Sequence, residues 1–387
     1  MHKRRTFHFS HIVASGKLVD DATIETDHGK ISAVSDRTTA DLDLSGYTAI
    51  PSFIDIHTHG FLGVDTASLT GDSMEKWKTT LPKTGTLKFV PTLVSTSRAN
   101  TQAFLREVSA SMNVPTLNGA FADVFGARLE GPFINPLKKG AHDEEFLIKP
   151  SIPNFNSLTG FGASTVKIID IAPELEGSID LIEYLVSRKI TVSIGHSNAD
   201  SGTARNAISN GASLATHLFN AMRKIHHRDP GIAVEAMIND AVSAEIINDP
   251  NHLSPEIINL AIRSKGDDRI VGITDSISAT MMPDGEYNLG SLTVNLSRGK
   301  CTVTGTDTIA GSVLTMDEAF RNFISQGYSI EQAVKFLSTN PARIMGLDNE
   351  GSIAVGKIAN IAVMDNRHMI YGIIKDGEFH ANKEEGI

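Results

Sequence analysis

The chain has 387 residues, a formal net charge of −10 and a hydrophobic fraction of 41%. Its length exceeds one ordinary domain and suits a barrel of about 250 residues with a smaller unit. The acidic balance argues against a nucleic acid partner, and no stretch reaches the roughly 18 continuous apolar residues of a membrane span. The basic start leads into a segment too polar for a secretory signal. A single cysteine, Cys301, excludes an intrachain disulfide, favours a reducing cytoplasm and lies in a predicted structural hairpin strand.

Both ends of the chain predict short strands separated by turns. Residues 1–49 contain β-rich pieces broken by Gly16, Gly29 and Gly46. Similar strand-like pieces separated by turns recur at 351–365 and 370–377. We therefore expect residues 1–49 and 346–387 to pair into one small β-sandwich domain.

Between these ends, in residues 50–345, apolar strand-like runs alternate with amphipathic helix-like segments. The predicted strands are 49–56, 86–94, 124–130, 166–172, 190–195, 213–217, 241–247 and 269–274. Eight strands in β/α alternation predict an α/β fold of the (β/α)8 barrel type. In such a barrel the active site lies at the carboxyl ends of the strands.

His57 and His59 come directly after the first of these runs. In an extended segment, residues i and i+2 point the same way, so both imidazoles can reach one cation. The pair alone is weak evidence, because among chains with 14 histidines in this length about one in two would contain a His-x-His by chance. For an isolated pair, the alternative is two histidines that fall at this spacing by chance, on the surface or in the core, and bind no metal.

Four other predicted strands also end in a side chain that can bind a metal ion. These side chains are Glu130, His196, His217 and Asp275. Each has a simpler alternative as a turn carboxylate, a capping side chain or a helix N-cap. Because all of them fall at strand ends together with His57 and His59, coincidence is the weaker explanation. The sequence therefore predicts a metal centre on the carboxyl face of the barrel.

Longer motifs surround these residues and span nearly the whole chain. The motifs are 51–60, 129–133, 140–142, 195–197, 216–222, 274–275 and 310–312. Together they resemble the amidohydrolase superfamily and, within it, the N-acetylglucosamine-6-phosphate deacetylases. Glu130 in Leu-Glu-Gly-Pro-Phe, where many relatives have a carboxylated lysine, is the most specific of these signals.

The resemblance implies a divalent metal centre. Glu130, His196 and His217 would hold one ion. His57 and His59 would supply a second site, with Glu130 bridging the two. Zinc is the expected ion, and iron, manganese and cobalt are alternatives.

The resemblance also implies the catalytic side chains. Asp275, next to the metal, would act as general base toward the attacking water and then as general acid toward the leaving amine. His142 would act near the acetyl group, with a simple loop histidine as its alternative.

Further residues would contact a phosphosugar. They are Ala141, His142, Asn220, Ala221, Arg228, His252 and Ile309. Arg228 lies in a cationic segment at 223–228, and an arginine suits bidentate phosphate binding. A solvated loop is the alternative for that segment.

These expectations describe a cytoplasmic, homodimeric enzyme that converts N-acetylglucosamine 6-phosphate and water into glucosamine 6-phosphate and acetate. Three alternatives remain. An N-acetylgalactosamine-6-phosphate deacetylase would share the metal residues. An amidohydrolase acting on a cyclic amide would share them too but would need no phosphate-binding segment. A non-catalytic amidohydrolase-like scaffold is disfavoured by retention of the whole predicted ligand set.

Overall fold

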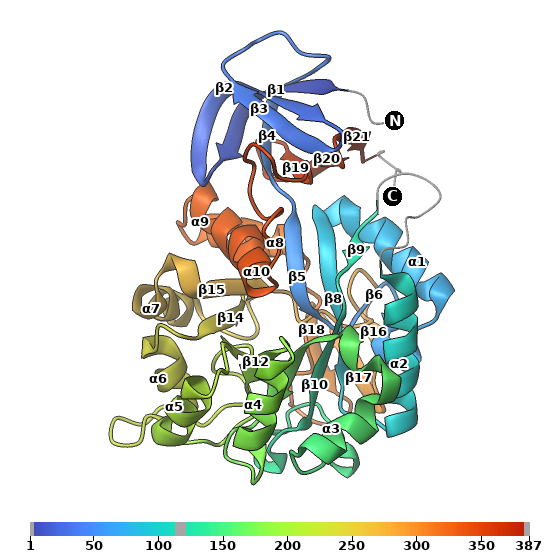
Figure 1. Cartoon of the computed structure of the whole chain (residues 1–387), viewed down its shortest axis with the longest axis vertical. Coiled ribbons are helices and arrows are strands. Elements are labelled where there is room, and N and C mark those ends of the chain that lie inside the picture. Colours follow the sequence, from blue (N-terminus) through green and yellow to red (C-terminus); the bar gives the residue numbers. More distant parts are fainter. Residues whose placement is uncertain (1–3, 113–120, 383–387) are drawn as a thin grey trace.

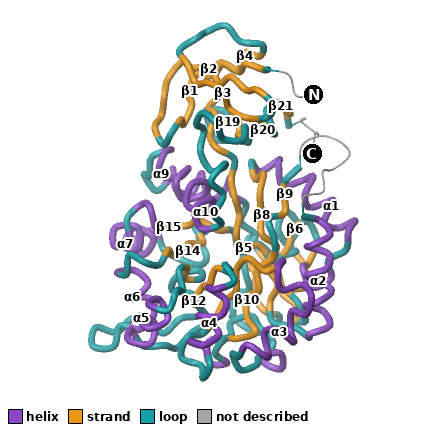
Figure 2. The backbone as a smooth tube through the Cα atoms, in the orientation of Figure 1, coloured by secondary structure: helices purple, strands orange, loops and turns teal. Residues whose placement is uncertain are grey.

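The computed structural model describes residues 4–112 and 121–382 and consists of a barrel and a smaller β-domain (Figure 1). Residues 1–3, in the basic start of the chain, lie outside the described residues. The barrel strands stand inside a layer of helices, and the β-domain lies at one end of the molecule (Figure 2). The fold class predicted from the sequence is confirmed.

The barrel is a parallel sheet whose main strands follow one another in chain order. They are β5 (Phe53–Thr58), β8 (Thr86–Val94), β10 (Ala127–Phe133), β11 (Val166–Ile171), β12 (Thr191–Ile194), β13 (Leu214–Ala215), β14 (Ser243–Ile247) and β15 (Ile270–Ile273). The short β9 (Asp123–Val124) pairs with β8. The sheet returns to its first strand where Thr58 bridges Ser276. Each of the eight predicted runs therefore overlaps a barrel strand, although β5 and β10 extend beyond the predicted ends at 56 and 130.

Helices connect the strands and cover the outside of the barrel. They are α1 (Gly71–Thr80), α2 (Arg98–Ser111), α3 (Ile152–Thr159), α4 (Ser178–Ser187), α5 (Ser201–Ser209), α6 (Gly231–Ile238), α7 (Pro255–Lys265), α8 (Met316–Ser325), α9 (Ile330–Val334) and α10 (Asn340–Ile344). In α4, Leu181, Ile182 and Leu185 share one face and are fully buried, which packs that face on the sheet. Strand β8 is buried at every position, as expected of a parallel strand covered on both faces.

The small β-domain is one seven-stranded sheet built from both ends of the chain. Its strands are β1 (Arg5–Ala14), β2 (Lys17–Asp27), β3 (Lys30–Ser35), β4 (Leu42–Pro51), β19 (Ile361–Met364), β20 (Ile370–Lys375) and β21 (Glu378–Ala381). Strand β4 joins the two ends, because it pairs with β1 on one side and with β19 on the other. Phe9, Ile24 and Ile361 are fully buried in the core of this domain.

The run at 49–56, predicted as one strand, belongs to two sheets. Ala49 and Ile50 lie in β4 and pair with β19, whereas β5 begins at Phe53. Ser52 separates the two strands, and its N–H donates to the Asn360 carbonyl oxygen at 3.1 Å. The part of the prediction that assigned 49–51 to the barrel strand was wrong, because an unbroken apolar run does not reveal a change of sheet. The domain boundary at residue 49 stays a prediction.

Two small antiparallel sheets lie beside the barrel. One pairs β6 (Gly60–Phe61) with β7 (Val64–Asp65), and the other contains β16 (Gly285–Leu289), β17 (Leu292–Ser297) and β18 (Lys300–Val303). Cys301 lies in β18 and is buried, which confirms its predicted structural position. In the described ranges, no helix is both long and apolar enough to cross a membrane.

Candidate functional site

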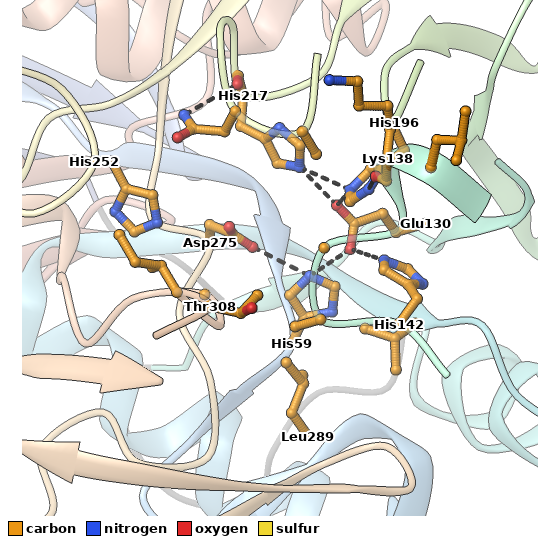
Figure 3. A pocket seen from close by; sticks show the side chains of 18 residues that line it. His59, Glu130, Lys138, His142, His196, His217, His252, Asp275, Leu289 and Thr308 are labelled. Carbon is orange, nitrogen blue, oxygen red and sulfur yellow. Dashed lines mark hydrogen bonds and ion pairs between the residues drawn. The ribbon is translucent and has the colours of Figure 1, made fainter. Parts of the chain in front are cut away.

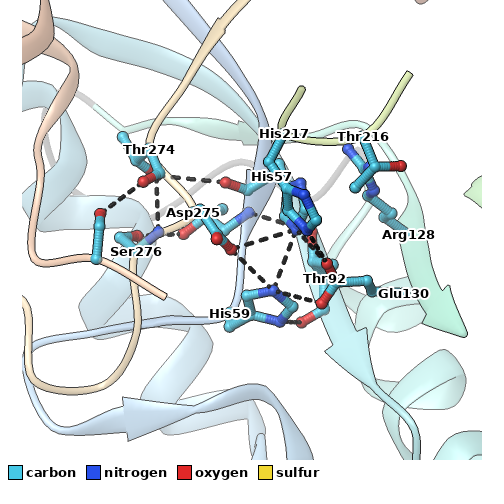
Figure 4. Close-up of polar contacts among 12 residues, drawn as sticks. His57, His59, Thr92, Arg128, Glu130, Thr216, His217, Thr274, Asp275 and Ser276 are labelled. Atoms are coloured by element: carbon cyan, nitrogen blue, oxygen red, sulfur yellow. Dashed lines mark hydrogen bonds and ion pairs between the residues drawn. The ribbon is translucent and has the colours of Figure 1, made fainter. Parts of the chain in front are cut away.

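The predicted metal-binding side chains come together at the carboxyl ends of the barrel strands (Figures 3 and 4). His57 lies in β5 with His59 just beyond it, and Glu130 lies in β10. The residues that follow β12, β13 and β15 are His196, His217 and Asp275. Because parallel barrel strands end at one face, residues far apart in the sequence meet there. None of the six is more than 7% exposed.

Glu130 lies between two pairs of histidines, of which Figure 4 labels His57, His59 and His217 and Figure 3 labels His196. Its Oε1 atom lies 3.0 Å from His196 Nε2 and 2.9 Å from His217 Nε2. Its Oε2 atom lies 3.2 Å from His59 Nε2, and its Oε1 lies 3.5 Å from His57 Nε2. One carboxylate thus contacts both the first pair (His57 and His59) and the second pair (His196 and His217).

The contacts within each pair test whether these residues fit a metal ion. The two Nε2 atoms of the first pair are 3.1 Å apart, and those of the second pair are also 3.1 Å apart. Because Glu245 faces His57 Nδ1 and backbone carbonyl oxygens face His59 Nδ1 and His196 Nδ1, the ring protons of these histidines reside on Nδ1 and their Nε2 atoms present lone pairs that a cation can accept. Imidazole nitrogens with carboxylate oxygens form a donor set suited to zinc and similar ions. The described residues fit a divalent metal ion.

The charges in the centre favour the same interpretation. Burial and Arg128 lower the pKa of His57, but Asp275 and Glu130 raise it to about 10. Burial also lowers the pKa of His59, which the same two carboxylates raise to about 9. Conversely, the histidines outweigh burial and hold the pKa values of Glu130 and Asp275 well below the usual range. The carboxylates therefore attract positive charge to the ring nitrogens, as they would attract a metal ion.

Asp275 faces the first pair from the end of β15. Its Oδ1 atom lies 3.1 Å from His59 Nε2 and 3.3 Å from His57 Nε2. Its φ of +52° is uncommon for a residue with a Cβ atom, and the turn ends the strand there. The Asp275 N–H donates to the His57 carbonyl oxygen at 2.9 Å, which fixes the carboxylate across the seam where the barrel closes.

A buried ion network supports the first pair from inside the barrel. His57 Nδ1 lies 3.2 Å from Glu245 Oε2. Arg128 donates to Glu245 and also to Asp170, through Nε at 3.0 Å and Nη2 at 2.8 Å. None of these three charged groups has exposed surface. Because a carboxylate at Nδ1 holds the ring proton there, Glu245 leaves His57 Nε2 free to bind a metal ion.

The second pair is oriented mainly by the main chain. His196 Nδ1 donates to the Lys138 carbonyl oxygen at 2.8 Å. His217 Nδ1 is buried and has no hydrogen-bond partner among the described residues. Their φ angles are +45° and +26°, so the chain turns sharply at each histidine just past β12 and β13. These turns direct both rings toward Glu130.

His142 adds a further imidazole to the centre. Its Nδ1 atom accepts from the Ser95 N–H at 3.2 Å and lies 2.9 Å from Ser95 Oγ. Its proton therefore resides on Nε2, which donates to Glu130 Oε2 at 3.1 Å. Burial, together with His196 and His59, lowers the pKa of His142 although Glu130 raises it. His142 is thus a neutral hydrogen-bond donor.

A cavity of about 360 Å³ opens above the centre. Of the predicted metal-binding residues, only His57 does not line it, because it is fully buried beneath. The predicted substrate contacts that line the cavity are Ala141, His142, Asn220, Ala221, His252 and Ile309. Thr308, Ile309 and Gly311 bring the loop after β18 to the cavity wall.

Of the predicted contacts, Arg228 alone is not brought to the cavity. It is exposed, and its Nη1 atom lies 2.8 Å from His227 Nε2. Its role in phosphate binding stays a prediction.

Other functional candidates were missed in the sequence. Lys138 lines the cavity, and its position just before the 140–142 motif was the available signal. Arg128 and Glu245 support the first pair, and a charge inside an otherwise apolar strand was the signal for each.

Relatives match this chain over about nine-tenths of its length. The amidohydrolase family model matches residues 48–382. An N-acetylglucosamine-6-phosphate deacetylase of Bacillus subtilis is 32% identical, over 92% of this chain and 91% of that protein. An N-acetylgalactosamine-6-phosphate deacetylase of Escherichia coli O157:H7 is 30% identical, over 92% of this chain and 96% of that protein.

A solved structure also resembles the chain over nearly its whole length. A mutant N-acetyl-D-glucosamine-6-phosphate deacetylase of Mycobacterium smegmatis, in complex with N-acetyl-D-glucosamine 6-phosphate, has a TM-score of 0.92 at 30% identity. The match covers 98% of this chain and 100% of that one. With the family model matching most of its length and these relatives matching nearly all of it, the chain belongs to the amidohydrolase family.

Proposed function

We propose that the chain is a metal-dependent hydrolase that removes the acetyl group from N-acetylglucosamine 6-phosphate, giving glucosamine 6-phosphate and acetate. The observation that carries the proposal is the buried centre at the floor of the cavity, where Glu130 lies between two histidine pairs. Relatives named for this reaction match the chain over about nine-tenths of its length, which supports the same substrate.

The metal would be held by both histidine pairs, Glu130 and Asp275. When bound, a divalent ion lowers the pKa of water and polarises a carbonyl oxygen. Zinc is the proposed ion because nitrogen and carboxylate donors suit it, with Glu130 shared where two ions are bound. Metal analysis by mass spectrometry tests this, and the proposal of zinc fails if the active protein contains only another metal.

Asp275 would carry the proton in this reaction. Its carboxylate takes a proton from the attacking water and returns it to the leaving nitrogen, while a C–O bond forms and the C–N bond breaks. With Nδ1 held as an acceptor by Ser95, His142 would turn its Nε2–H from Glu130 to the acetyl group when the substrate is bound. Asp275 would thus transfer the proton, and His142 would orient the acetyl group.

The rest of the cavity would hold the sugar. Ala141, Asn220, Ala221, His252 and Ile309 are the proposed contacts, because all of them line the cavity above the centre. His252 is kept in position by Asp249, whose Oδ2 lies 2.9 Å from its Nδ1.

The assembly and location of the enzyme are part of the proposal. A single buried cysteine suits a cytoplasmic protein, and the family resemblance favours a homodimer. Light scattering on the purified protein should give a mass near twice the 41.6 kDa of one chain. A mass near that of one chain would contradict the dimer.

Acetate release from three sugars tests the proposed reaction. We expect the highest kcat/KM with N-acetylglucosamine 6-phosphate, a lower value with N-acetylgalactosamine 6-phosphate and the lowest with unphosphorylated N-acetylglucosamine. The Asp275→Asn variant, purified in the same way, serves as the background control. A preference for the galacto epimer would support the alternative suggested by the Escherichia coli relative. Release of acetate from none of them, with hydrolysis of dihydrouracil, would favour a cyclic-amide substrate.

A further inference from the structure

One part of the cavity wall is apolar. Among the described residues that line the cavity, Val94 and Leu289 are the large apolar side chains that are buried, at 5% and 3% exposed. Ala141, which also lines the cavity, packs against the hydrophobic cluster that contains both of them. Asn220 and His252, proposed as sugar contacts, are polar. The cavity therefore offers polar side chains to a sugar and a buried apolar wall to another part of a ligand.

The apolar wall lies near the proposed position of the acetyl group. Leu289 is on the same side of Glu130 as His142, opposite the second histidine pair (Figure 3). Val94 is followed directly by Ser95, whose N–H donates to His142 Nδ1 at 3.2 Å. Because His142 is the proposed contact of the acetyl group, the wall lies where the methyl end of that group would be placed.

Hydrogen bonds on both sides of Leu289 fix its position at the end of β16. The Gly290 N–H donates to Asp65 Oδ2 at 3.0 Å. On the other side, Ser278 Oγ donates to the Asn288 carbonyl oxygen at 2.6 Å. Both partners come from segments that follow barrel strands, Asp65 after β5 and Ser278 after β15. The barrel therefore holds both chain neighbours of the leucine.

The turn between β16 and β17 also packs tightly against the end of β8. Gly290 has a φ of +60°, and a Cβ atom there would lie 2.6 Å from Val94 Cγ2, which is too close for any side chain. Only glycine allows this approach. Ser291 Oγ lies 3.0 Å from Asp143 Oδ2, in the residue that follows His142. The turn at 289–291 is thus a fixed part of the wall beside the centre.

We propose that Leu289 limits the length of the acyl group that the enzyme removes from the amino sugar. The inference rests on the proposed function, because it concerns the acyl group of that substrate. A methyl group is stabilised when it leaves water for an apolar wall, whereas a longer acyl chain would meet a leucine that is held in place. One extra methylene in an apolar pocket typically changes kcat/KM by about 10- to 200-fold.

The test compares the wild type with Leu289→Ala and Leu289→Val. The measured quantity is the ratio of kcat/KM for N-propionylglucosamine 6-phosphate to kcat/KM for N-acetylglucosamine 6-phosphate. We expect a wild-type ratio of about 0.005 to 0.1. Leu289→Ala removes the isopropyl group from the wall and should raise the ratio about tenfold or more. Leu289→Val, a milder truncation that disturbs folding less, should raise the ratio by a smaller factor.

A matched control shortens a leucine of the same hairpin. Leu296 lies in β17 and in the same hydrophobic cluster but is not among the described residues that line the cavity. Leu296→Ala should therefore leave the ratio unchanged, and metal content should be the same in every variant.

Three outcomes would overturn the inference while acetate release still supports the proposed function. They are an unchanged ratio in both Leu289 variants, an equal rise in Leu296→Ala, and a wild-type ratio near one. If the metal-loaded wild type released neither acetate nor propionate from these sugars, the proposed function would fail and the inference with it.

Discussion

The two histidine pairs bind the same carboxylate but are supported in different ways. The first pair, His57 and His59, lies deepest, and His57 contacts Glu245 of a fully buried ion network. The second pair, His196 and His217, is directed inward by turns of the main chain, and its one Nδ1 partner is a backbone carbonyl. Side-chain charge therefore orients His57, whereas the backbone orients the second pair and also His59, whose Nδ1 lies 3.0 Å from the Thr92 carbonyl oxygen.

This difference determines which substitutions can disturb each pair. The network under the first pair can be broken by changing one charged side chain. The carbonyl that supports His196 is present whatever residue stands at 138. Variants around the first pair should therefore cause larger losses than variants in the surroundings of the second pair.

The largest expected effect is at Asp275, which faces the first pair directly. Asp275→Asn keeps the size of the side chain but removes the base, and general acid–base catalysis contributes typically about 10²–10⁴-fold. We expect turnover to fall by that factor in a steady-state assay of acetate release. Metal content serves as the control, because a variant that retains metal separates proton transfer from metal loss. Turnover near the wild-type value would exclude Asp275 as the base.

The next effect concerns stability and the arginine under the first pair. Arg128→Met leaves Asp170 and Glu245 buried without their cation, and breaking a buried ion pair costs about 3–5 kcal/mol. We expect the free energy of unfolding in urea to fall by this amount. Lys149→Met, which breaks an exposed pair with Glu176, is the control and should change little. Equal stability of the two variants would mean that the network is not a structural support.

Glu245 connects that network to the metal ligands, so its effect should appear in metal affinity. Glu245→Gln keeps the shape but weakens the hold on His57 Nδ1, and such outer contacts are worth about 10- to 100-fold in affinity. Competition with a chelator measures the loss. The matched control is Glu235→Gln, a buried carboxylate paired with Arg205 away from the centre. If both variants bind metal like the wild type, the first pair does not depend on side-chain charge.

The fold could be predicted because hydrophobic patterning records which segments are strands. Strand β8 was predicted at 86–94 and forms over those residues. Strand β13 is shorter than its prediction of 213–217, because the turn at His217 ends it after Ala215. The passage from β4 to β5 at Ser52 could not be predicted, because both strands are apolar and only pairing distinguishes them.

The candidate site was predictable where its residues lie at strand ends. That rule located both histidine pairs, Glu130 and Asp275. It could not locate partners that depend on three-dimensional contacts: Arg128 reaches Asp170 and Glu245 across 42 and 117 positions of sequence. It also could not show that Lys138 reaches the cavity while Arg228 does not, because each is a cation in a loop.

The smallest expected effect concerns the hydrogen bond between Ser95 and His142. Neither partner is charged, so this bond can be compared with the ion network under His57. Ser95 Oγ lies 2.9 Å from His142 Nδ1, while the Ser95 N–H also donates to that atom. Ser95→Ala removes only the hydroxyl, and a neutral hydrogen bond is worth about 0.5–1.5 kcal/mol. We therefore expect kcat/KM to fall about 2- to 12-fold with unchanged metal content. Ser178→Ala, which removes a buried hydroxyl that donates to the Ala172 carbonyl oxygen and does not line the cavity, is the control for general disturbance. A loss of kcat/KM in Ser95→Ala as large as that in Asp275→Asn would show that the hydroxyl takes part in proton transfer. The size of the loss would then no longer follow from whether the lost contact is charged or neutral.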